Sequence, residues 1–181
     1  YEAKNRPQFN PLILHVANQE QLNLYVANVP DDCMKLMEAF SPGPITFLLD
    51  KNLNVPDVVT AGSKKVAIRI PNHPLTLHLL NSLRFPLAAP SANPSGYVSP
   101  VSAEHVLQGL QGRIPYILDG GKAIVGLEST IVGFNAGETI VHRLGGITLE
   151  QIESIIKKPV KILITHDSPE TPGQLKSHYA T

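Results

Sequence analysis

The sequence predicts a mixed α/β protein in which helices flank one open sheet. Apolar runs of strand length alternate with longer amphipathic runs. Sixteen prolines, roughly twice the average usage, are spread along the chain and favour short elements joined by rigid turns over a helical bundle. With 181 residues, the chain is long enough for one domain with a sizeable core.

The first half of the chain is expected to supply three strands and three helices. The expected strands are residues 12–16, 45–49 and 66–70, and the expected helices are residues 19–27, 31–40 and 74–83. Cys33, Leu36 and Phe40 share one face of the second helix, which predicts that this face is buried. Residues 52–63 are predicted to form a polar loop.

The second half is expected to add shorter strands and two helices. Ser99 is the predicted N-cap of a helix that starts at Pro100 and ends near residue 108. Thr148 is the predicted N-cap of a helix over 148–157. The expected strands are residues 116–118, 130–134, 139–143 and 160–164, with a hairpin turn at 135–138. From residue 165 the chain becomes polar, which predicts a linker or tail over 165–181.

Residues 86–100 are the stretch around which the other motifs are arranged. The stretch begins with an apolar run that can end a buried strand, and it continues as a loop of small and hydroxyl residues. A strand, a small-residue loop and a helix start together aim backbone N–H groups at a phosphate. An ordinary proline-rich connection is the alternative interpretation.

Composition excludes several classes of protein. Fifteen basic and fifteen acidic residues cancel, which disfavours autonomous nucleic-acid binding but leaves room for a local patch. Cys33 is the single cysteine, so no disulfide framework exists, and a buried apolar role in a reduced, cytoplasmic setting is expected. No apolar run approaches the roughly 20 residues of a membrane span, and no signal peptide is visible.

The common catalytic motifs are absent from the sequence. There is no phosphate-binding Gly-x-x-x-x-Gly-Lys loop, no Gly-x-Gly-x-x-Gly, no His-Glu-x-x-His and no Gly-x-Ser-x-Gly. The seven histidines lack the spacing of a zinc site. The loops instead carry hydroxyls, amides and a few cations, which suit binding and charge stabilisation better than covalent catalysis.

Cations and a serine at strand ends are the remaining candidates. Arg69 and Arg143 end apolar strands, where a guanidinium presents a planar fork to a carboxylate or phosphate. The alternative for each is a solvated arginine at a sheet edge. Ser129 directly precedes a strand, where its hydroxyl could contact a ligand or cap the turn. These residues together predict a site for an anionic ligand.

Six short motifs occur in an order that resembles one known family. They lie at residues 4–12, 41–46, 69–74, 89–96, 128–130 and 143–145. In this order they resemble the YrdC-like family of threonylcarbamoyl-AMP synthases, over roughly residues 4–160. The resemblance implies a YrdC-like twisted open mixed sheet with flanking helices, and a catalytic domain over residues 1–164. Residues 171–180 resemble the linker of a longer, two-domain subtype. The family's threonine-rich first strand has no counterpart here, so we expect further sequence upstream, as well as a C-terminal domain.

The resemblance also implies a reaction. Members condense L-threonine, bicarbonate or CO2, and ATP into threonylcarbamoyl-AMP and pyrophosphate with the help of Mg²⁺. A downstream tRNA threonylcarbamoyl-transferase then modifies tRNA to its t6A form. The alternative that stays open is a nucleotide- or RNA-binding module without catalytic activity, and a local tRNA contact is compatible with either.

By resemblance, site residues fall into three groups. Charge stabilisation is implied for Lys4 and Arg6, with no covalent nucleophile. The implied ATP contacts are Arg6, Asn10, Lys65, Ser91, Ser99, Arg143 and Tyr179. The implied threonine contacts are His15, Arg69, the Ala89 backbone and Ser129. The resemblance assigns no metal ligand.

Overall fold

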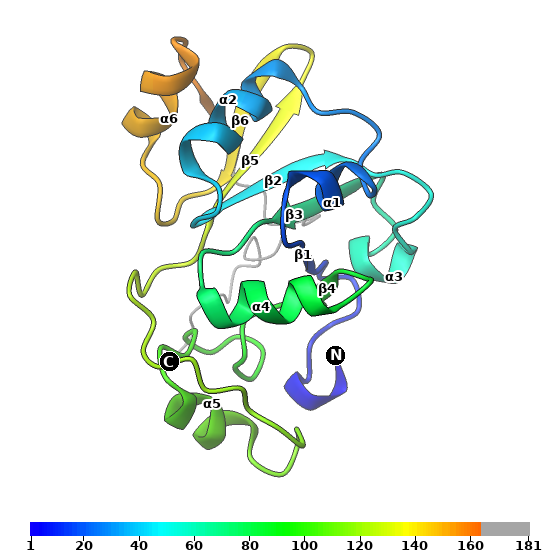
Figure 1. The fold of residues 1–181 in the computed structure, drawn as a ribbon, viewed down its shortest axis with the longest axis vertical. Coiled ribbons are helices and arrows are strands. Elements are labelled where there is room, and N and C mark those ends of the chain that lie inside the picture. Colours follow the sequence, from blue (N-terminus) through cyan, green and yellow to red (C-terminus); the bar gives the residue numbers. More distant parts are fainter. Residues whose placement is uncertain (164–181) are drawn as a thin grey trace.

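A computed structural model describes residues 1–163 and shows one seven-stranded sheet in the order β4-β1-β3-β2-β5-β6-β7 (Figure 1). The strands are β1 (Ile13–His15), β2 (Ile45–Asp50), β3 (Lys65–Arg69), β4 (Leu87–Ala89), β5 (Thr130–Asn135), β6 (Glu138–Arg143) and β7 (Lys161–Ile162). The pairs β1–β3, β2–β5 and β6–β7 are parallel, and β1–β4, β2–β3 and β5–β6 are antiparallel. The predicted mixed open sheet is therefore confirmed.

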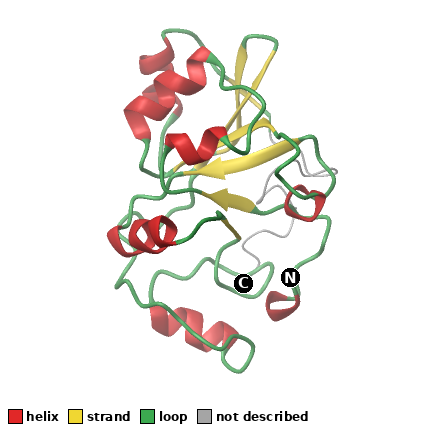
Figure 2. Cartoon of the chain, turned by 45° about the vertical axis from the view of Figure 1, so that its right-hand side comes forward, coloured by secondary structure: helices red, strands yellow, loops and turns green. Residues whose placement is uncertain are grey.

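Six α-helices and one 3-10 turn surround the sheet in the described part of the chain. They are η1 (Glu2–Lys4), α1 (Gln19–Asn23), α2 (Asp31–Phe40), α3 (Asp57–Thr60), α4 (Pro74–Ser82), α5 (Ala103–Leu110) and α6 (Leu149–Ile156). Figure 2 shows α2 and α6 side by side against the sheet, with α5 at the opposite end of the molecule. None of the helices within residues 1–163 is long and apolar enough to span a membrane.

The main core lies between one face of the sheet and a group of helices that includes α2 and α6. Val66 and Ile68 of β3 pack there with Cys33 and Leu36 of α2 and Ile152 of α6. Burial raises the pKa of the Cys33 thiol to about 12, so the thiol stays neutral. The expectation that Cys33 is a buried apolar residue is therefore confirmed.

The opposite face of the sheet carries a much smaller apolar cluster: Ile13, Leu48, Ala67 and Ile131. Because side chains alternate along a strand, Lys65 and Arg69 share this face with Ala67. Arg143 pairs with Ile131 and so belongs to the same face. This face is therefore polar and basic around a small apolar centre, which is where a ligand site is expected.

The predicted hairpin is confirmed, and its turn has the expected chemistry. Ala136 and Gly137 both have positive φ, 48° and 78°, between β5 and β6. Two such residues in succession match the right-handed twist of the flanking strands. Thr148 caps α6 as predicted, within a capping box that also uses the Gln151 side chain.

Several predicted elements differ from the structure. Residues 116–118 form no strand, and the Tyr116 and Leu118 side chains are exposed. The helix expected at Pro100 starts at Ala103, because the Ser102 hydroxyl, not that of Ser99, accepts the His105 N–H at 3.4 Å. Helix α1 ends at Asn23 and does not reach residue 27.

Two further differences concern the loop predicted at residues 52–63 and the last strand of the described chain. The loop predicted at 52–63 contains the one-turn helix α3. Strand β7 covers residues 161–162 only; residues 160 and 163 of the strand predicted over 160–164 are not part of it, and residue 164 lies outside the described residues. The predicted linker at 165–181 lies outside them as well.

Candidate active site

Lys4 connects the N-terminal segment to the loop that follows β4. The Lys4 side chain is buried, and its Nζ donates to the Ser91 carbonyl at 2.5 Å and to the Asn93 carbonyl. The Ser95 N–H donates in turn to the Lys4 carbonyl at 2.8 Å. Burial and the nearby Arg6 charge lower the pKa of Lys4 to about 8. The structure therefore brings Lys4 and Ser91 together, 87 residues apart in the chain.

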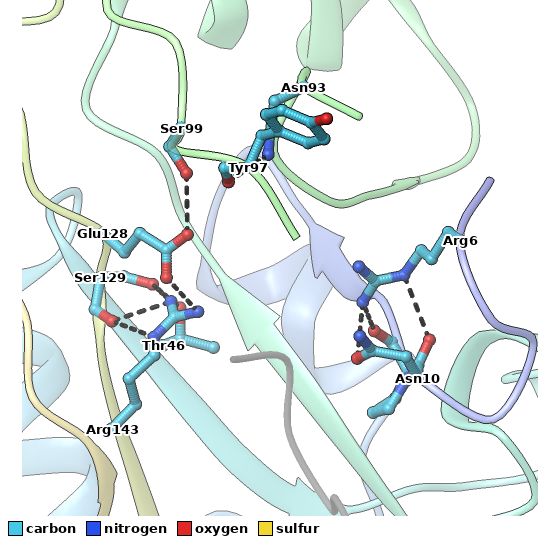
Figure 3. A network of polar contacts seen from close by, with 10 residues as sticks. Arg6, Asn10, Thr46, Asn93, Tyr97, Ser99, Glu128, Ser129 and Arg143 are labelled. Atoms are coloured by element: carbon cyan, nitrogen blue, oxygen red, sulfur yellow. Dashed lines mark hydrogen bonds and ion pairs between the residues drawn. The ribbon is translucent and has the colours of Figure 1, made fainter. Parts of the chain in front are cut away.

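Arg6 and Asn10 face each other a few residues further on (Figure 3). Arg6 Nη2 donates to Asn10 Oδ1 at 2.8 Å and to the Pro11 carbonyl at 2.5 Å, while Nε donates to the Asn10 carbonyl at 3.3 Å. Asn10 is 3% exposed. Burial lowers the pKa of Arg6, although a guanidinium remains charged. Local bonds thus fix the orientation of the Arg6 charge.

Lys4, Ser91, Arg6 and Asn10 form the first cluster of the site. Asn93 adjoins this cluster, although the predicted site residues do not include it. It is 7% exposed, its Nδ2 donates to the Pro94 and Tyr97 carbonyls, and its own carbonyl accepts from Lys4. Its buried Oδ1 has no hydrogen-bond partner within the described part of the chain. The motif at residues 89–96 contains Asn93 and could have marked it as a site residue. The sequence alone did not show whether its amide shapes the loop or contacts a ligand.

A second cluster surrounds Arg143 at the end of β6 (Figure 3). Its guanidinium donates to the Ser129 carbonyl at 3.1 and 2.9 Å and to the Ser129 hydroxyl at 3.0 Å. The Ser129 hydroxyl also shares a hydrogen bond of 2.7 Å with Thr46 on β2. Ser129 is 2% exposed, so these bonds hold it firmly in one position. Two predicted residues, Ser129 and Arg143, are therefore in direct contact.

Glu128 joins this second cluster to the loop that carries Ser99. Its Oε2 pairs with Arg143 Nη1 at 2.7 Å, and its Oε1 accepts the Ser99 hydroxyl at 2.9 Å. The Ser99 side chain thus binds a carboxylate instead of capping a helix. The sequence placed Glu128 in a motif without giving it a role, because its partners lie 29 and 15 residues away.

His15, Arg69 and Ala89 lie on three neighbouring strands. His15 is in register with Arg69 on β3, and Ile13 is in register with Ala89 on β4. His15 Nδ1 is 3.3 Å from the Leu87 carbonyl. Burial and the Arg69 charge lower the pKa of His15 to about 4, so the ring is neutral at pH 7.

Arg69 is held at the end of β3 by one bond. Its Nε donates to the Gly43 carbonyl at 2.9 Å, which directs the guanidinium across the strand end. Burial and the charge of Arg143 lower the pKa of Arg69, so the two guanidinium groups interact electrostatically. Two arginines near each other with hydroxyls alongside form a site for a carboxylate or a phosphate.

Lys65 does not join either cluster. It shares the sheet face of Arg69 but lies at the other end of β3, roughly 13 Å along the strand. Its Nζ donates to the Phe134 carbonyl at 3.2 Å. It lines a pocket of about 600 Å³ whose walls include Asp50 and the start of α2. Tyr179, the other predicted ATP contact outside the clusters, lies beyond the described residues.

The two clusters interact electrostatically. The negative charge of Glu128 raises the pKa of both Lys4 and Arg6, against the larger effect of burial, so its field reaches the first cluster. Within residues 1–163, no group of three or more His, Cys, Asp or Glu side chains is arranged to hold a metal ion. The arrangement offers fixed cations and hydroxyls for an anionic ligand, and no nucleophile–base pair is built into it.

Comparison with known proteins identifies the family. The Sua5/YciO/YrdC family model, described as "Telomere recombination", matches residues 1–145. The chain belongs to this family. It is 41% identical over 184 residues to the threonylcarbamoyl-AMP synthase of Pyrococcus abyssi and 44% identical over 188 residues to that of Bacillus subtilis. Each alignment covers 99% of this chain, and 54% and 53% of the two relatives, so the chain spans about half their length.

A solved structure agrees with the fold. The crystal structure of P. abyssi Sua5 complexed with L-threonine superposes with a TM-score of 0.94 at 41% identity, and the match covers 99% of this chain and 54% of that one. The family resemblance and the twisted open sheet that the sequence predicted are both confirmed.

Proposed function

We propose that this chain carries the catalytic domain of an L-threonylcarbamoyladenylate synthase, a nucleotidyltransferase that makes threonylcarbamoyl-AMP and pyrophosphate. The reactants are L-threonine, bicarbonate or CO2, and ATP. The observation that carries the proposal is the match over 99% of the chain, with a TM-score of 0.94, to a family member crystallised with L-threonine. The positions of the cations and hydroxyls on one sheet face support it.

The threonine is proposed to bind between β3, β1 and β5. Arg69 ends β3 with one N–H committed to Gly43, so the rest of its planar fork can take the threonine carboxylate. His15 is neutral and adds no competing charge, while the Ala89 backbone and the Ser129 hydroxyl complete the contacts. These groups would fix the amine for carbamate formation by positioning alone.

The nucleotide is proposed to bind against the first cluster and Arg143. Arg6 and Asn10 are already oriented toward each other, the Ser91 carbonyl accepts from Lys4, and Ser99 follows in the same loop after β4. Lys65 lies roughly 13 Å along β3 from Arg69, so it would contact a part of the nucleotide distant from the threonine. Tyr179 keeps its ATP role on the family resemblance alone.

The chemical step is proposed to be charge stabilisation. A carbamate oxygen of N-carboxythreonine forms a bond to the α-phosphorus of ATP, and the bond to the bridging oxygen breaks, which releases pyrophosphate with its electron pair. Lys4 and Arg6 would stabilise the charge that develops on pyrophosphate. No side chain needs to form a covalent bond.

Mg²⁺ is proposed to enter as part of the ATP substrate. The described residues offer no cluster of metal-binding side chains, which does not fit a dedicated protein site for the ion. Mg²⁺ commonly keeps most of its water and binds through nucleotide phosphates.

The product would pass to a tRNA threonylcarbamoyl-transferase for t6A formation, in the cytoplasm. The position of this chain before the transferase follows from the product of the reaction, an activated threonylcarbamoyl group whose acceptor is tRNA. The equal numbers of basic and acidic residues support a role for this chain upstream of tRNA, with any tRNA contact local.

Pyrophosphate release tests the proposal. The chain is incubated with ATP, Mg²⁺ and bicarbonate, with L-threonine, with L-serine or with no amino acid. We expect release that depends on threonine and is much weaker with serine. Tight binding of ATP and threonine without any release would instead support the alternative, a binding module without catalytic activity.

A further inference from the structure

Glu128 occupies a position that the proposed chemistry does not use. Its carboxylate is largely buried, with a side-chain exposure of 14%, and so is its partner Arg143, at 12%. Both carboxylate oxygens are engaged, one by Arg143 and one by Ser99. A carboxylate among cations that bind an anionic ligand weakens that binding by repulsion. Its presence here therefore calls for a separate role.

A continuous chain of bonds runs through Glu128. It begins at the Ser99 hydroxyl, passes through Glu128 to Arg143, and continues from Arg143 to the Ser129 hydroxyl and then to Thr46. Ser99 lies in the loop assigned to the nucleotide, and Ser129 lies in the part assigned to threonine. Arg143, which is assigned to the nucleotide, bonds Ser129 directly, and its largely buried ion pair with Glu128 extends this link to Ser99 (Figure 3).

The backbone around Glu128 is fixed as well. The Gly146 N–H donates to the Glu128 carbonyl at 2.9 Å, and a Cβ on Gly145 would come within 2.2 Å of that carbonyl. These contacts fix the main chain from which the Glu128 side chain reaches Arg143. A buried pair of this kind is costly to break, because the remaining charge would lose its partner.

We propose that Glu128 is a positioning residue that couples the nucleotide half of the site to the threonine half through its contacts with Ser99 and Arg143. This proposal rests on the proposed function. A ligand that orders either end of the bonded chain also orders the other end, so the second ligand binds to a prepared site. Glu128 itself touches neither ligand in this account.

The test measures how each ligand changes the affinity for the other. Titration calorimetry on the full chain gives the Kd of α,β-methylene-ATP, which cannot be cleaved at the α-phosphate, with and without saturating L-threonine. In the unmodified chain, threonine is expected to tighten analogue binding by about fivefold or more. In Glu128→Gln, which keeps the shape but removes the charge, we expect the factor to fall, because Ser99 loses its charged link to Arg143 while the direct bond from Arg143 to Ser129 remains.

Two further variants separate positioning from simple damage. Glu38→Gln removes an exposed carboxylate on α2 and should leave the coupling factor unchanged. Ser99→Ala breaks the same chain of bonds at its end, and should lower the factor even if Glu128→Gln does not fold. The double variant Glu128→Gln/Ser99→Ala should lose no more coupling than Glu128→Gln alone.

The outcomes are distinct. If the unmodified chain binds neither ligand, the proposed function fails and this proposal falls with it. If it couples the two ligands and Glu128→Gln couples them equally, only the role of Glu128 is overturned. Full coupling in Ser99→Ala would likewise overturn it, because the link would then not run through this hydroxyl.

Discussion

At the scale of single residues, Arg6 carries the most specific expectation for turnover. Its guanidinium is oriented by Asn10 and Pro11 and lies beside Lys4. We expect Arg6→Ala to lower kcat/KM for ATP by about a hundredfold or more, the usual effect of losing a charge-stabilising donor. Steady-state pyrophosphate release measures it. The melting temperature should fall only modestly, because the substitution removes the Arg6 donors of Asn10 and Pro11 but no contact of the main core.

The matched control is Arg84→Ala, which removes an exposed arginine after α4. It should leave kcat/KM unchanged. Kinetics in Arg6→Ala that resemble those of Arg84→Ala would remove the nucleotide role assigned to Arg6.

Lys4 predicts a pH dependence. Its pKa falls from 10.5 to about 8 in the folded protein because the ammonium is buried beside Arg6. The charge is therefore lost as the pH rises through 8, and kcat/KM for ATP should fall with it. The pH–rate profile measures this effect. In Lys4→Arg, whose side chain stays charged, the falling limb near pH 8 should disappear.

The lowered pKa of Lys4 also predicts how the free energy of unfolding changes with pH. Between pH 8 and 10.5 the unfolded chain binds more protons at this lysine than the folded chain does, so the free energy of unfolding should rise with pH in that window. Denaturant unfolding at several pH values compares the chain with Lys4→Arg. An identical slope in both would contradict the burial of a titrating Lys4 ammonium.

At the scale of elements, the turn after β6 determines where the strand β5 begins. Gly145 lies so close to the Glu128 carbonyl and to Thr130 N, 2.2 and 2.7 Å from its ideal Cβ, that a methyl group cannot fit without moving the backbone. We expect Gly145→Ala to destabilise the fold by about 1–3 kcal/mol. It should also weaken threonine binding, because Ser129 would shift with the chain. Calorimetry measures the affinity and denaturant unfolding measures the stability.

Gly112→Ala is the control for Gly145→Ala. Gly112, in the loop after α5, has a φ of 75° and open space around its Cβ position. Its substitution should cost stability through backbone strain alone. If Gly112→Ala weakens threonine binding as much as Gly145→Ala does, the effect reflects general destabilisation and the local argument fails.

Elements were predictable where their signals were local. The hairpin at 135–138 and the Thr148 cap depend on neighbouring residues, so the sequence was sufficient. The start of α5 was misplaced because Ser99 and Ser102 are both plausible caps. Only the contact of Ser99 with Glu128, 29 residues away, decides between them. The apolar run at 116–118 was mistaken for a strand because an exposed loop and a strand can share that composition.

At the scale of the whole molecule, the sheet separates two functions. Its helix-covered face forms the core, and its other face carries the arginines and hydroxyls around a small apolar centre. The sequence predicted the individual cations at strand ends, since each follows an apolar run. It could not show that Lys65 lies away from the clusters, or that Glu128 links Ser99 to Arg143. Both facts depend on strand register and on the return of distant loops.

The central claim concerns a product, so product identity tests it most directly. The chain is incubated with ATP, Mg²⁺, L-threonine and ¹³C-bicarbonate, and the nucleotide products are analysed by mass spectrometry. The account predicts a threonylcarbamoyl-AMP that carries the ¹³C label and forms together with pyrophosphate. Formation of unlabelled threonyl-AMP, or of AMP and pyrophosphate without any threonine adduct, would contradict it.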